Sequence, residues 1–168
     1  LLFLTTMKKY ESVIDSIFLS NNGEIDLLTG AISPDRFDQI VKRDLAMAQR
    51  NPAKISMIST AINLTQFFTD NQTLDSLEQQ SMIENELVNL HFNLKSTFRQ
   101  SDCICRVSKL GFWILLNGAD KRTSDQLVDR LVRELPKFIT VGMCLWQQDE
   151  SILDWYKRVD QIHFNNNQ

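Results

Sequence analysis

Two short apolar runs near the middle of the chain constrain its fold most strongly. Residues 102–107 and 112–116 are rich in Cys, Ile, Val, Phe and Leu, and only four residues separate them. A connection this short joins antiparallel neighbours, because a parallel pair of strands needs a crossover of a dozen or more residues. The sequence therefore predicts a β-hairpin with a tight turn at residues 108–111.

Apolar residues at helical spacing surround this hairpin. They predict helices over residues 7–19, 123–135 and 151–164, a helix that begins at Ser33-Pro34, and one long helix that ends near Phe98. Ser33 suits the N-cap position, and Pro34 suits the first helical position. Apolar, β-branched runs predict two further strands, over residues 55–62 and 138–146. The order α-α-β-α-β-β-α-β-α predicts an α/β sandwich (an α+β arrangement) whose helices flank a central mixed sheet with a β-hairpin.

Length and charge fit a single globular domain. The 168 residues can bury one sizeable core, and 43% hydrophobic with 23% charged residues is typical of globular proteins. A net charge of −3 gives no overall field toward nucleic acid or an anionic membrane, so we expect no nucleic-acid partner. A local basic pocket remains compatible with that value.

Cysteine usage and hydropathy bear on the compartment. Cys103, Cys105 and Cys144 lack Cys-x-x-Cys spacing and indicate reduced thiols in a cytosolic protein. No run of 18 apolar residues predicts a membrane span. We expect residues 1–22 to be an N-terminal helix and linker from an upstream region, and residues 23–168 to be the domain. The expected location is the cytoplasm, either as a free protein or as the cytoplasmic part of a membrane-anchored one.

The sequence lacks the common motifs of phosphate and metal chemistry. It contains no Gly-rich phosphate loop, no His/Cys/Asp cluster at metal spacing and no Gly-x-Ser-x-Gly turn. A phosphoryl-transfer enzyme needs paired carboxylates at strand ends to hold Mg²⁺. The residues at those places are Ala61, Asn63, Leu110 and Gly111. None of these side chains is a carboxylate, so we expect no metal site there.

The chain resembles GGDEF domains, the family of the diguanylate cyclases, over about residues 20–165. The matching segments follow the family's order and spacing, apart from extra residues around 71–83. They are Asp26-x-Leu28-Thr29-Gly30 followed by Phe37, Glu84-x-x-Leu87, Asp102-x-x-x-Arg106, the hairpin turn at residues 108–112, Ile139-Thr140-Val141-Gly142, Glu150-Ser151 and Trp155-x-x-Arg158-Val159-Asp160. The resemblance implies a nucleotidyl-cyclase-like sandwich and descent from an enzyme that joins two GTP into cyclic di-GMP with two metal ions.

Carried over by position, the resemblance implies a degenerate member without catalysis. The Gly-Gly-Asp-Glu-Phe motif falls on Ser-Lys-Leu-Gly-Phe, so the metal-binding and catalytic acids become Leu110 and Gly111, and a further metal-binding Asp falls on Ala61. Two guanine-contact positions and one phosphate-contact position are also altered, at Thr69, Glu84 (a partial match) and near Asn167. Loss of a single transition-state charge stabiliser typically costs about 10²–10³ in rate. We therefore expect no enzyme activity and no cofactor.

A second feature of the family is retained. Many members carry Arg-x-x-Asp five residues before the motif turn, as an inhibitory site that binds cyclic di-GMP. Arg99 and Asp102 stand at that spacing, and a supporting Arg of the family falls on Arg130. An Arg fork can form paired hydrogen bonds with guanine or phosphate, and an Asp can accept from guanine N–H groups. The alternative is a surface ion pair at a helix end, without any ligand.

Two functions are therefore expected to compete. The first is a cyclic di-GMP receptor that uses Arg99, Asp102 and Arg130, reports to a protein partner or upstream sensor, and can bridge two copies as a homodimer. The second is a pseudo-enzyme that dimerises or binds other proteins independently of any nucleotide. Arg106 also matches a position of the family, and we expect it to be a structural ion-pair partner.

Overall fold

The computed structural model describes residues 10–50, 53–70 and 75–166. A short N-terminal helix over residues 10–16 comes first. The elements that follow are α2 (Pro34–Arg50), β1 (Ile55–Ile62), α3 (Leu64–Asp70), α4 (Ser76–Thr97), β2 (Cys103–Arg106), β3 (Gly111–Asn117), α5 (Lys121–Glu134), β4 (Ile139–Leu145) and α6 (Ile152–Asn166). The predicted strand over residues 55–62 and the hairpin are confirmed.

The strands form one four-stranded sheet in the order β2-β3-β1-β4. Each neighbouring pair is antiparallel, with Ser59 of β1 opposite Trp113 of β3 and Gly142 of β4. The predicted mixed sheet is therefore wrong for these strands. β1 and β2 run in the same direction, but β3 lies between them, so no parallel pair forms; this is the split β-α-β-β-α-β arrangement. A single parallel bridge, between Ile32 and Cys105, adds the loop before α2 to the β2 edge.

The predicted long helix that ends near Phe98 is confirmed as α4, and a short helix that was not predicted, α3, precedes it. Asp75 is the N-cap of α4, and its side chain accepts a hydrogen bond from the backbone N–H of Glu78 at 2.9 Å. Asn63 has a similar role at α3, since its side-chain oxygen accepts from the N–H of Gln66 at 3.2 Å. α3 has only seven residues, too few for apolar spacing to predict it.

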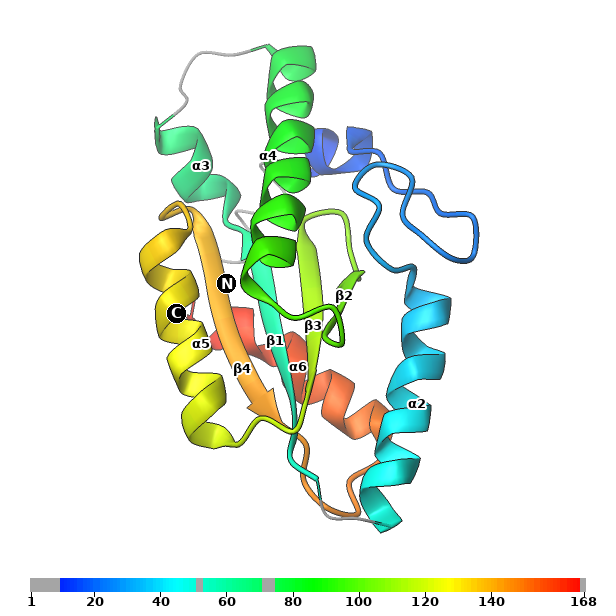
Figure 1. Cartoon of the computed structure of the whole chain (residues 1–168). Helices are drawn as coiled ribbons and strands as arrows, with labels where there is room; N and C mark the ends of the chain where they lie inside the picture. Colours follow the sequence, from blue (N-terminus) through cyan, green and yellow to red (C-terminus); the bar gives the residue numbers. More distant parts are fainter. Residues whose placement is uncertain (1–9, 51–52, 71–74, 167–168) are drawn as a thin grey trace.

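The sheet separates two apolar cores, because successive side chains of a strand point to opposite faces. Ile58 and Ile114 lie in the core under α4 and α5, and Met57 and Leu115 lie in the core under α2 and α6. Figure 1 shows α4 and α5 in front of the sheet and α6 behind it. The N-terminal helix joins the first core through Tyr10, Val13 and Ile17.

Helix caps fix where α2 and α6 begin. The Ser33 hydroxyl accepts from the N–H of Arg36 at 3.4 Å, as the sequence predicted, and the Ser151 hydroxyl accepts from the N–H of Asp154 at 3.1 Å. All three cysteines are free thiols. Of the helices in the described residues, none combines the length and the apolar character that crossing a membrane requires.

Candidate functional site

The predicted ligand residues Arg99 and Asp102 form the turn that follows α4. The Arg99 guanidinium is 68% exposed and contacts the Asp102 carboxylate through two long hydrogen bonds of 3.4 Å, whereas the Asp102 side chain is only 4% exposed. The carboxylate also accepts from the backbone N–H of Arg99 at 3.0 Å. Asp102 is therefore fixed by the turn, whereas the exposed Arg99 head group makes only long hydrogen bonds, a third one of 3.4 Å going to the backbone oxygen of Asn117.

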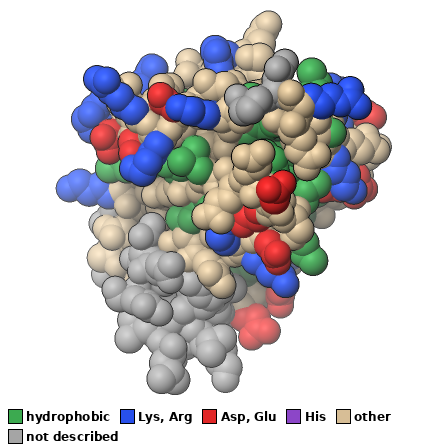
Figure 2. Space-filling view, turned by 90° about the horizontal axis from the view of Figure 1, so that it is seen from below, with side chains coloured by type: hydrophobic (Ala, Val, Ile, Leu, Met, Phe, Trp, Pro, Cys, Tyr) green, Lys and Arg blue, Asp and Glu red, His purple; other side chains and the backbone are tan. Residues whose placement is uncertain are grey.

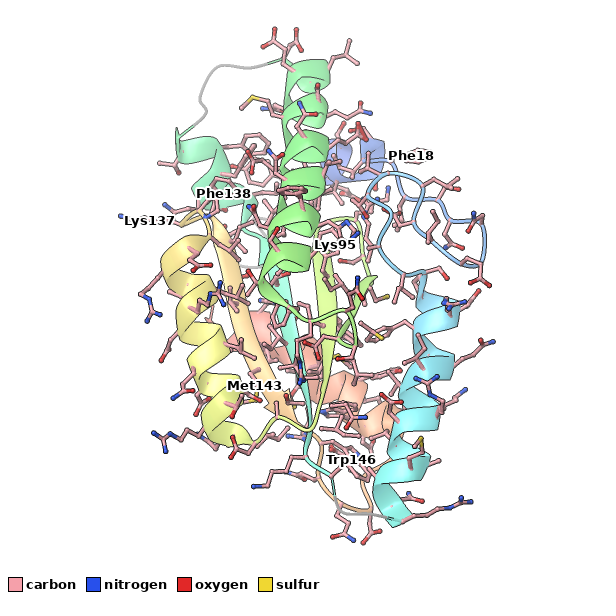
Figure 3. The ribbon with its side chains drawn as sticks, viewed as in Figure 1. Phe18, Lys95, Lys137, Phe138, Met143 and Trp146 are labelled. Atoms are coloured by element: carbon pink, nitrogen blue, oxygen red, sulfur yellow. The ribbon has the colours of Figure 1, made fainter. Side chains whose placement is uncertain are left out.

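A hollow of about 320 Å³ lies beside this turn. The C-terminal part of α4, the start of β2 and the loop before α2 enclose it, and it is lined by Gly30, Ala31, Ile32, His91, Lys95, Phe98, Arg99, Gln100, Asp102 and Ile104. Lys95 is exposed on the lower half of α4 (Figure 3) and adds a second cation to that of Arg99. Two cations and one carboxylate suit a ligand that carries both phosphate and hydrogen-bond donors.

His91 forms the inner wall of this hollow. It is buried, and its ring stacks on Phe112 with ring centroids 5.9 Å apart. Burial, and then the charge of Lys95, lower the pKa of His91, so the ring is neutral at pH 7. His91 therefore offers the hollow an apolar and weakly polar wall and no positive charge.

Arg130, the third predicted ligand residue, is not among the residues that line the hollow. It lies on α5, about half exposed, and its Nε donates to Glu134 at 3.0 Å. α5 packs over β4 and β1, whereas the hollow lies at the β2 edge of the sheet. Within one copy of the described chain, the fold does not bring Arg130 together with Arg99 and Asp102 at this hollow.

Arg106 is the structural ion-pair partner that the sequence predicted. Its Nη1 lies 3.1 Å from Oδ1 of Asp26, and both side chains are almost fully buried. Its Nη2 donates to the backbone oxygen of Lys109 at 3.1 Å, which ties the hairpin turn to the loop at residues 26–30. The same carboxylate of Asp26 accepts from the N–H and hydroxyl of Thr29.

The turn at residues 108–112 is packed tightly against β1. The N–H of Ile62 donates to the backbone oxygen of Leu110 at 3.0 Å. A Cβ atom at Gly111 would lie only 2.9 Å from the backbone oxygen of Thr60 and 3.6 Å from Cβ of Ala61. Real Cβ atoms do not approach backbone oxygen so closely, so the turn as folded accepts only glycine at this position.

A second hollow, of about 440 Å³, lies on the other face of the sheet, between α2 and α6 and next to this turn. Asp35, Asp38, Asp160 and His163 supply ionisable groups to its wall, and none of the described residues that line it is a Lys or Arg. Burial raises the pKa of Asp160 and lowers that of His163. A wall of carboxylates without a cation disfavours a triphosphate, because like charges repel.

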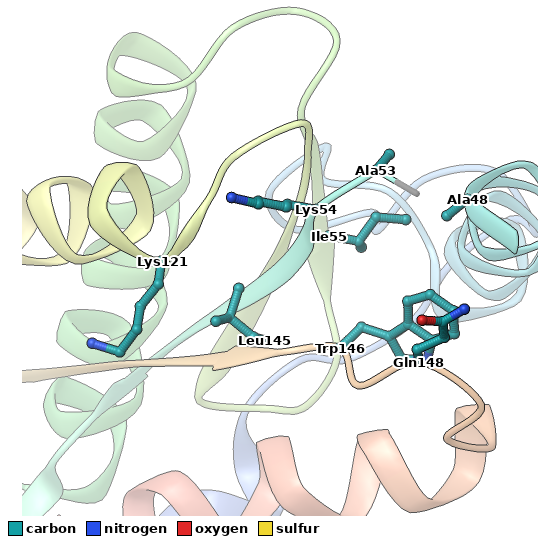
Figure 4. A pocket seen from close by; sticks show the side chains of 8 residues that line it. All are labelled: Ala48, Ala53, Lys54, Ile55, Lys121, Leu145, Trp146 and Gln148. Atoms are coloured by element: carbon teal, nitrogen blue, oxygen red, sulfur yellow. The ribbon is translucent and has the colours of Figure 1, made fainter. Parts of the chain in front are cut away.

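A third hollow, of about 270 Å³, lies at the lower end of the sheet (Figure 4). Lys54 and Lys121 supply two ammonium groups, and Trp146 supplies an aromatic wall. The Lys121 ammonium is already bound to Asp125 at 2.8 Å. Figure 2 shows the same end of the molecule, where Lys and Arg side chains gather at the upper left, so a net charge of −3 coexists with a locally basic surface.

Comparison with solved structures identifies the fold. The GGDEF domain of FimX from Pseudomonas aeruginosa superposes with a TM-score of 0.71 and 13% identity, over 84% of this chain and 92% of that domain. The GGDEF domain of DgcB from Caulobacter crescentus, in complex with c-di-GMP, superposes with a TM-score of 0.67 and 13% identity, over 89% and 93%. This chain has the fold of a GGDEF domain.

A third similar structure is the diguanylate cyclase SiaD from Pseudomonas aeruginosa, in complex with its activator SiaC. It has a TM-score of 0.71 and 15% identity, and the match covers 99% of this chain and 64% of SiaD. No protein-family model and no curated protein sequence matches the chain. The GGDEF fold is therefore recognised from the three-dimensional arrangement and from the short motifs quoted above.

The structure also shows where the altered catalytic and nucleotide-contact positions lie in the GGDEF fold. Ala61 and Gly111 face each other across β1 and β3, beside the second hollow, while Leu110 packs against the first core. Their side chains carry no oxygen that could bind a metal ion. Thr69 is exposed on α3, with its hydroxyl donating to the backbone oxygen of Thr65. Asn167 lies outside the described residues.

Sequence reasoning missed two residues at the Arg99 hollow, Lys95 and His91. A signal for Lys95 was present, since it lies in the last turn of the helix that leads directly to Arg99. His91 precedes Lys95 by four residues, but a lone histidine beside an apolar helical stripe is more often a core or surface residue than a ligand. Its burial against Phe112 agrees with the core interpretation.

Proposed function

We propose that this chain is a catalytically inactive GGDEF domain that acts in the cytoplasm as a receptor for cyclic di-GMP. The observation that carries the proposal is the hollow in which Arg99, Lys95 and Asp102 converge. Cyclic di-GMP presents two phosphates and the donor and acceptor edges of two guanines. The cations suit the phosphates or the guanine acceptor edge, and the carboxylate suits guanine N–H groups.

Inactivity is supported by the residues at the motif turn. Leu110, Gly111 and Ala61 replace the acids that the resemblance implies, and the adjacent hollow is acidic. The tight contact of Gly111 with Thr60 leaves no space for a side chain at that place. The chain therefore has the fold of a cyclase but lacks the carboxylates that would hold the metal ions and activate the attacking hydroxyl group.

In this proposal, Arg130 of a second copy of the chain contacts the bound cyclic di-GMP. Because it does not line the hollow, its contact with the ligand is made when cyclic di-GMP bridges two domains, and the messenger then acts as the link of a homodimer. This assignment agrees with its half-exposed position on the outside of α5. A protein partner or an upstream sensor reads out the liganded state.

Titration calorimetry with cyclic di-GMP tests the receptor function. We expect heat at micromolar ligand for the natural chain, and at least about a tenfold weaker affinity for Arg99→Ala, because one charge-assisted hydrogen bond contributes roughly 1.5–3 kcal/mol. Arg122→Ala is the matched control, since Arg122 and Asp125 repeat the Arg-x-x-Asp spacing on α5 away from the hollow. Absence of heat for the natural chain at tens of micromolar ligand refutes the proposal.

A second function, a ligand-independent interaction module, is favoured by one surface feature. Leu77, Val88 and Phe92 of α4 are 76%, 40% and 70% exposed. Val88 and Phe92 are one turn apart and form a small exposed apolar patch, and Leu77 lies on the same side of the helix beyond the polar residues Ser81 and Asn85. Sedimentation analysis with and without cyclic di-GMP separates the two functions. Self-association that is abolished by Phe92→Ser and indifferent to the ligand supports the interaction module.

A further inference from the structure

Two hydrogen bonds hold the end of the N-terminal helix and the residues that follow it against the rest of the domain. Nζ of Lys109, in the turn at residues 108–112, donates to the backbone oxygen of Asp15 at 2.9 Å. The backbone N–H of Phe18 donates to Oε2 of Glu84, on α4, at 2.9 Å. Figure 3 shows Phe18 next to the upper part of α4. The two contacts join residues that are 94 and 66 positions apart in the sequence.

Apolar packing adds to these contacts. Tyr10, Val13 and Ile17 are 9%, 8% and 2% exposed and belong to the core under α4. The ring of Tyr10 lies on that of Phe68, from α3, with centroids 5.0 Å apart. Residues 10–17 are thus seated on α3 and α4 by one apolar face, as expected for a helix whose stripe is buried.

The ammonium group of Lys109 is suited to the C-terminal end of the N-terminal helix. Asp15 is near the C-terminal end of the helix over residues 10–16, where backbone oxygens lack helical partners and carry the negative end of the helix dipole. A lysine side chain stabilises such an end, whereas the acids that the resemblance implies in this turn would repel it. The backbone of Lys109 is itself held in position, because its oxygen accepts from Arg106.

The neighbouring Leu110 adds an apolar contact on the same side of the sheet. It is half-buried and packs against the core to which Tyr10 and Ile17 belong. The turn therefore presents one cation to the helix end and one apolar side chain to the core that the helix joins. Glu84, the partial match to a guanine-contact position, accepts a backbone N–H of the same segment.

We propose that residues 10–18 are an intramolecular ligand of the former active-site turn, with Lys109 and Glu84 as its binding residues. The docked segment packs against α3, α4 and the turn, and it occupies the backbone-facing acceptor of Glu84, a position where the resemblance implies contact with guanine. Release of the segment uncovers the apolar surface around Phe68 and transmits a change from the N-terminal region to this domain. This docking does not depend on cyclic di-GMP.

Hydrogen exchange measured on the full chain by mass spectrometry tests the proposal. Lys109→Met keeps the apolar stem of the side chain and removes the ammonium, and Glu84→Ala removes the acceptor for Phe18. We expect each variant to speed exchange in residues 10–19 by about 2- to 5-fold, as the loss of one weak exposed contact gives, and to leave β1 unchanged. Lys157→Met is the matched control, because Lys157 is exposed on α6.

Three outcomes overturn the proposal. The first is exchange in residues 10–19 that is the same in Lys109→Met, Glu84→Ala and the control. The second is protection that depends on protein concentration, which assigns the contact to a second copy. The third is faster exchange of the segment in Arg99→Ala, which would couple it to the cyclic di-GMP hollow; the expected result there is no change.

Discussion

Arg106 and Asp26 form an ion pair in which the two side chains are 0% and 2% exposed. Burial lowers the pKa of Arg106, and the charge and hydrogen bonds of Asp26 oppose that shift. The pair links the loop before α2 to the hairpin, and through the Lys109 backbone it also fixes the turn that holds the N-terminal helix. Nε of Arg106 has no hydrogen-bond partner among the described residues, so the pair contains one unsatisfied donor.

The first prediction concerns this buried pair. Arg106→Met should lower the free energy of unfolding by about 3–5 kcal/mol, because it leaves the Asp26 carboxylate buried without its cation. Urea denaturation provides the measurement. Arg36→Met is the control, since Arg36 and Glu24 form an exposed pair, for which a loss of about 0–1 kcal/mol is expected. Equal losses in the two variants would contradict the structural role assigned to Arg106.

The second prediction concerns the motif turn. Gly111→Glu should not create a cyclase, and it should destabilise the domain by about 1–3 kcal/mol, because a Cβ atom there overlaps the backbone oxygen of Thr60. Product analysis after incubation with GTP and Mg²⁺ or Mn²⁺, together with urea denaturation, checks both parts. Cyclic di-GMP formed by either the natural chain or the variant would refute the proposed inactivity.

The third prediction tests the packing of α6 on β4. A Cβ atom at Gly142 would lie 1.9 Å from Cγ2 of Ile162. Gly142→Ala should therefore destabilise the domain by about 1–3 kcal/mol. Ile162→Ala removes the overlapping methyl group, so the double variant should lose less than the sum of the two single losses. Additive losses in thermal or urea unfolding would show that the two positions are not in contact.

The fourth prediction is a dependence of stability on pH. Burial lowers the pKa of both His91 and His163 in the folded chain, so below about pH 6.5 the unfolded chain binds more protons than the folded one. The free energy of unfolding should therefore be fully retained above about pH 7 and should fall as the pH drops to about 5.5. The raised pKa values of Asp160 and Glu86 act in the opposite direction at lower pH.

Urea denaturation of His163→Gln at the same pH values checks this assignment. The substitution removes one of the two titrating rings, so the loss of stability on acidification should be smaller than in the natural chain. Because Nε2 of His163 lies 2.6 Å from the hydroxyl of Ser59, the variant is also expected to be less stable at neutral pH. An unchanged pH slope would assign the dependence to other groups.

Local patterns of the sequence determined much of this protein. The apolar run at Ile55–Ile62, the short connection inside the hairpin and the Ser33-Pro34 start of α2 were predictable, because each depends on residues adjacent in the chain. The absence of acids at Ala61, Leu110 and Gly111 was equally visible. The position of Arg99 and Asp102, three residues apart at the end of a helix, was also predictable from neighbouring residues, and in the structure both line one hollow.

Only the tertiary structure decided which of these elements meet. The insertion of β3 between β1 and β2, which makes the sheet antiparallel, depends on pairing between Ile55–Ile62 and a strand about 60 residues later in the chain. The position of Arg130 away from the hollow depends on α5 packing over β4, and the contact of Lys109 with Asp15 depends on where the first helix docks. Periodicity specifies which face of an element is buried, but not its partner, because many pairings bury the same apolar surface.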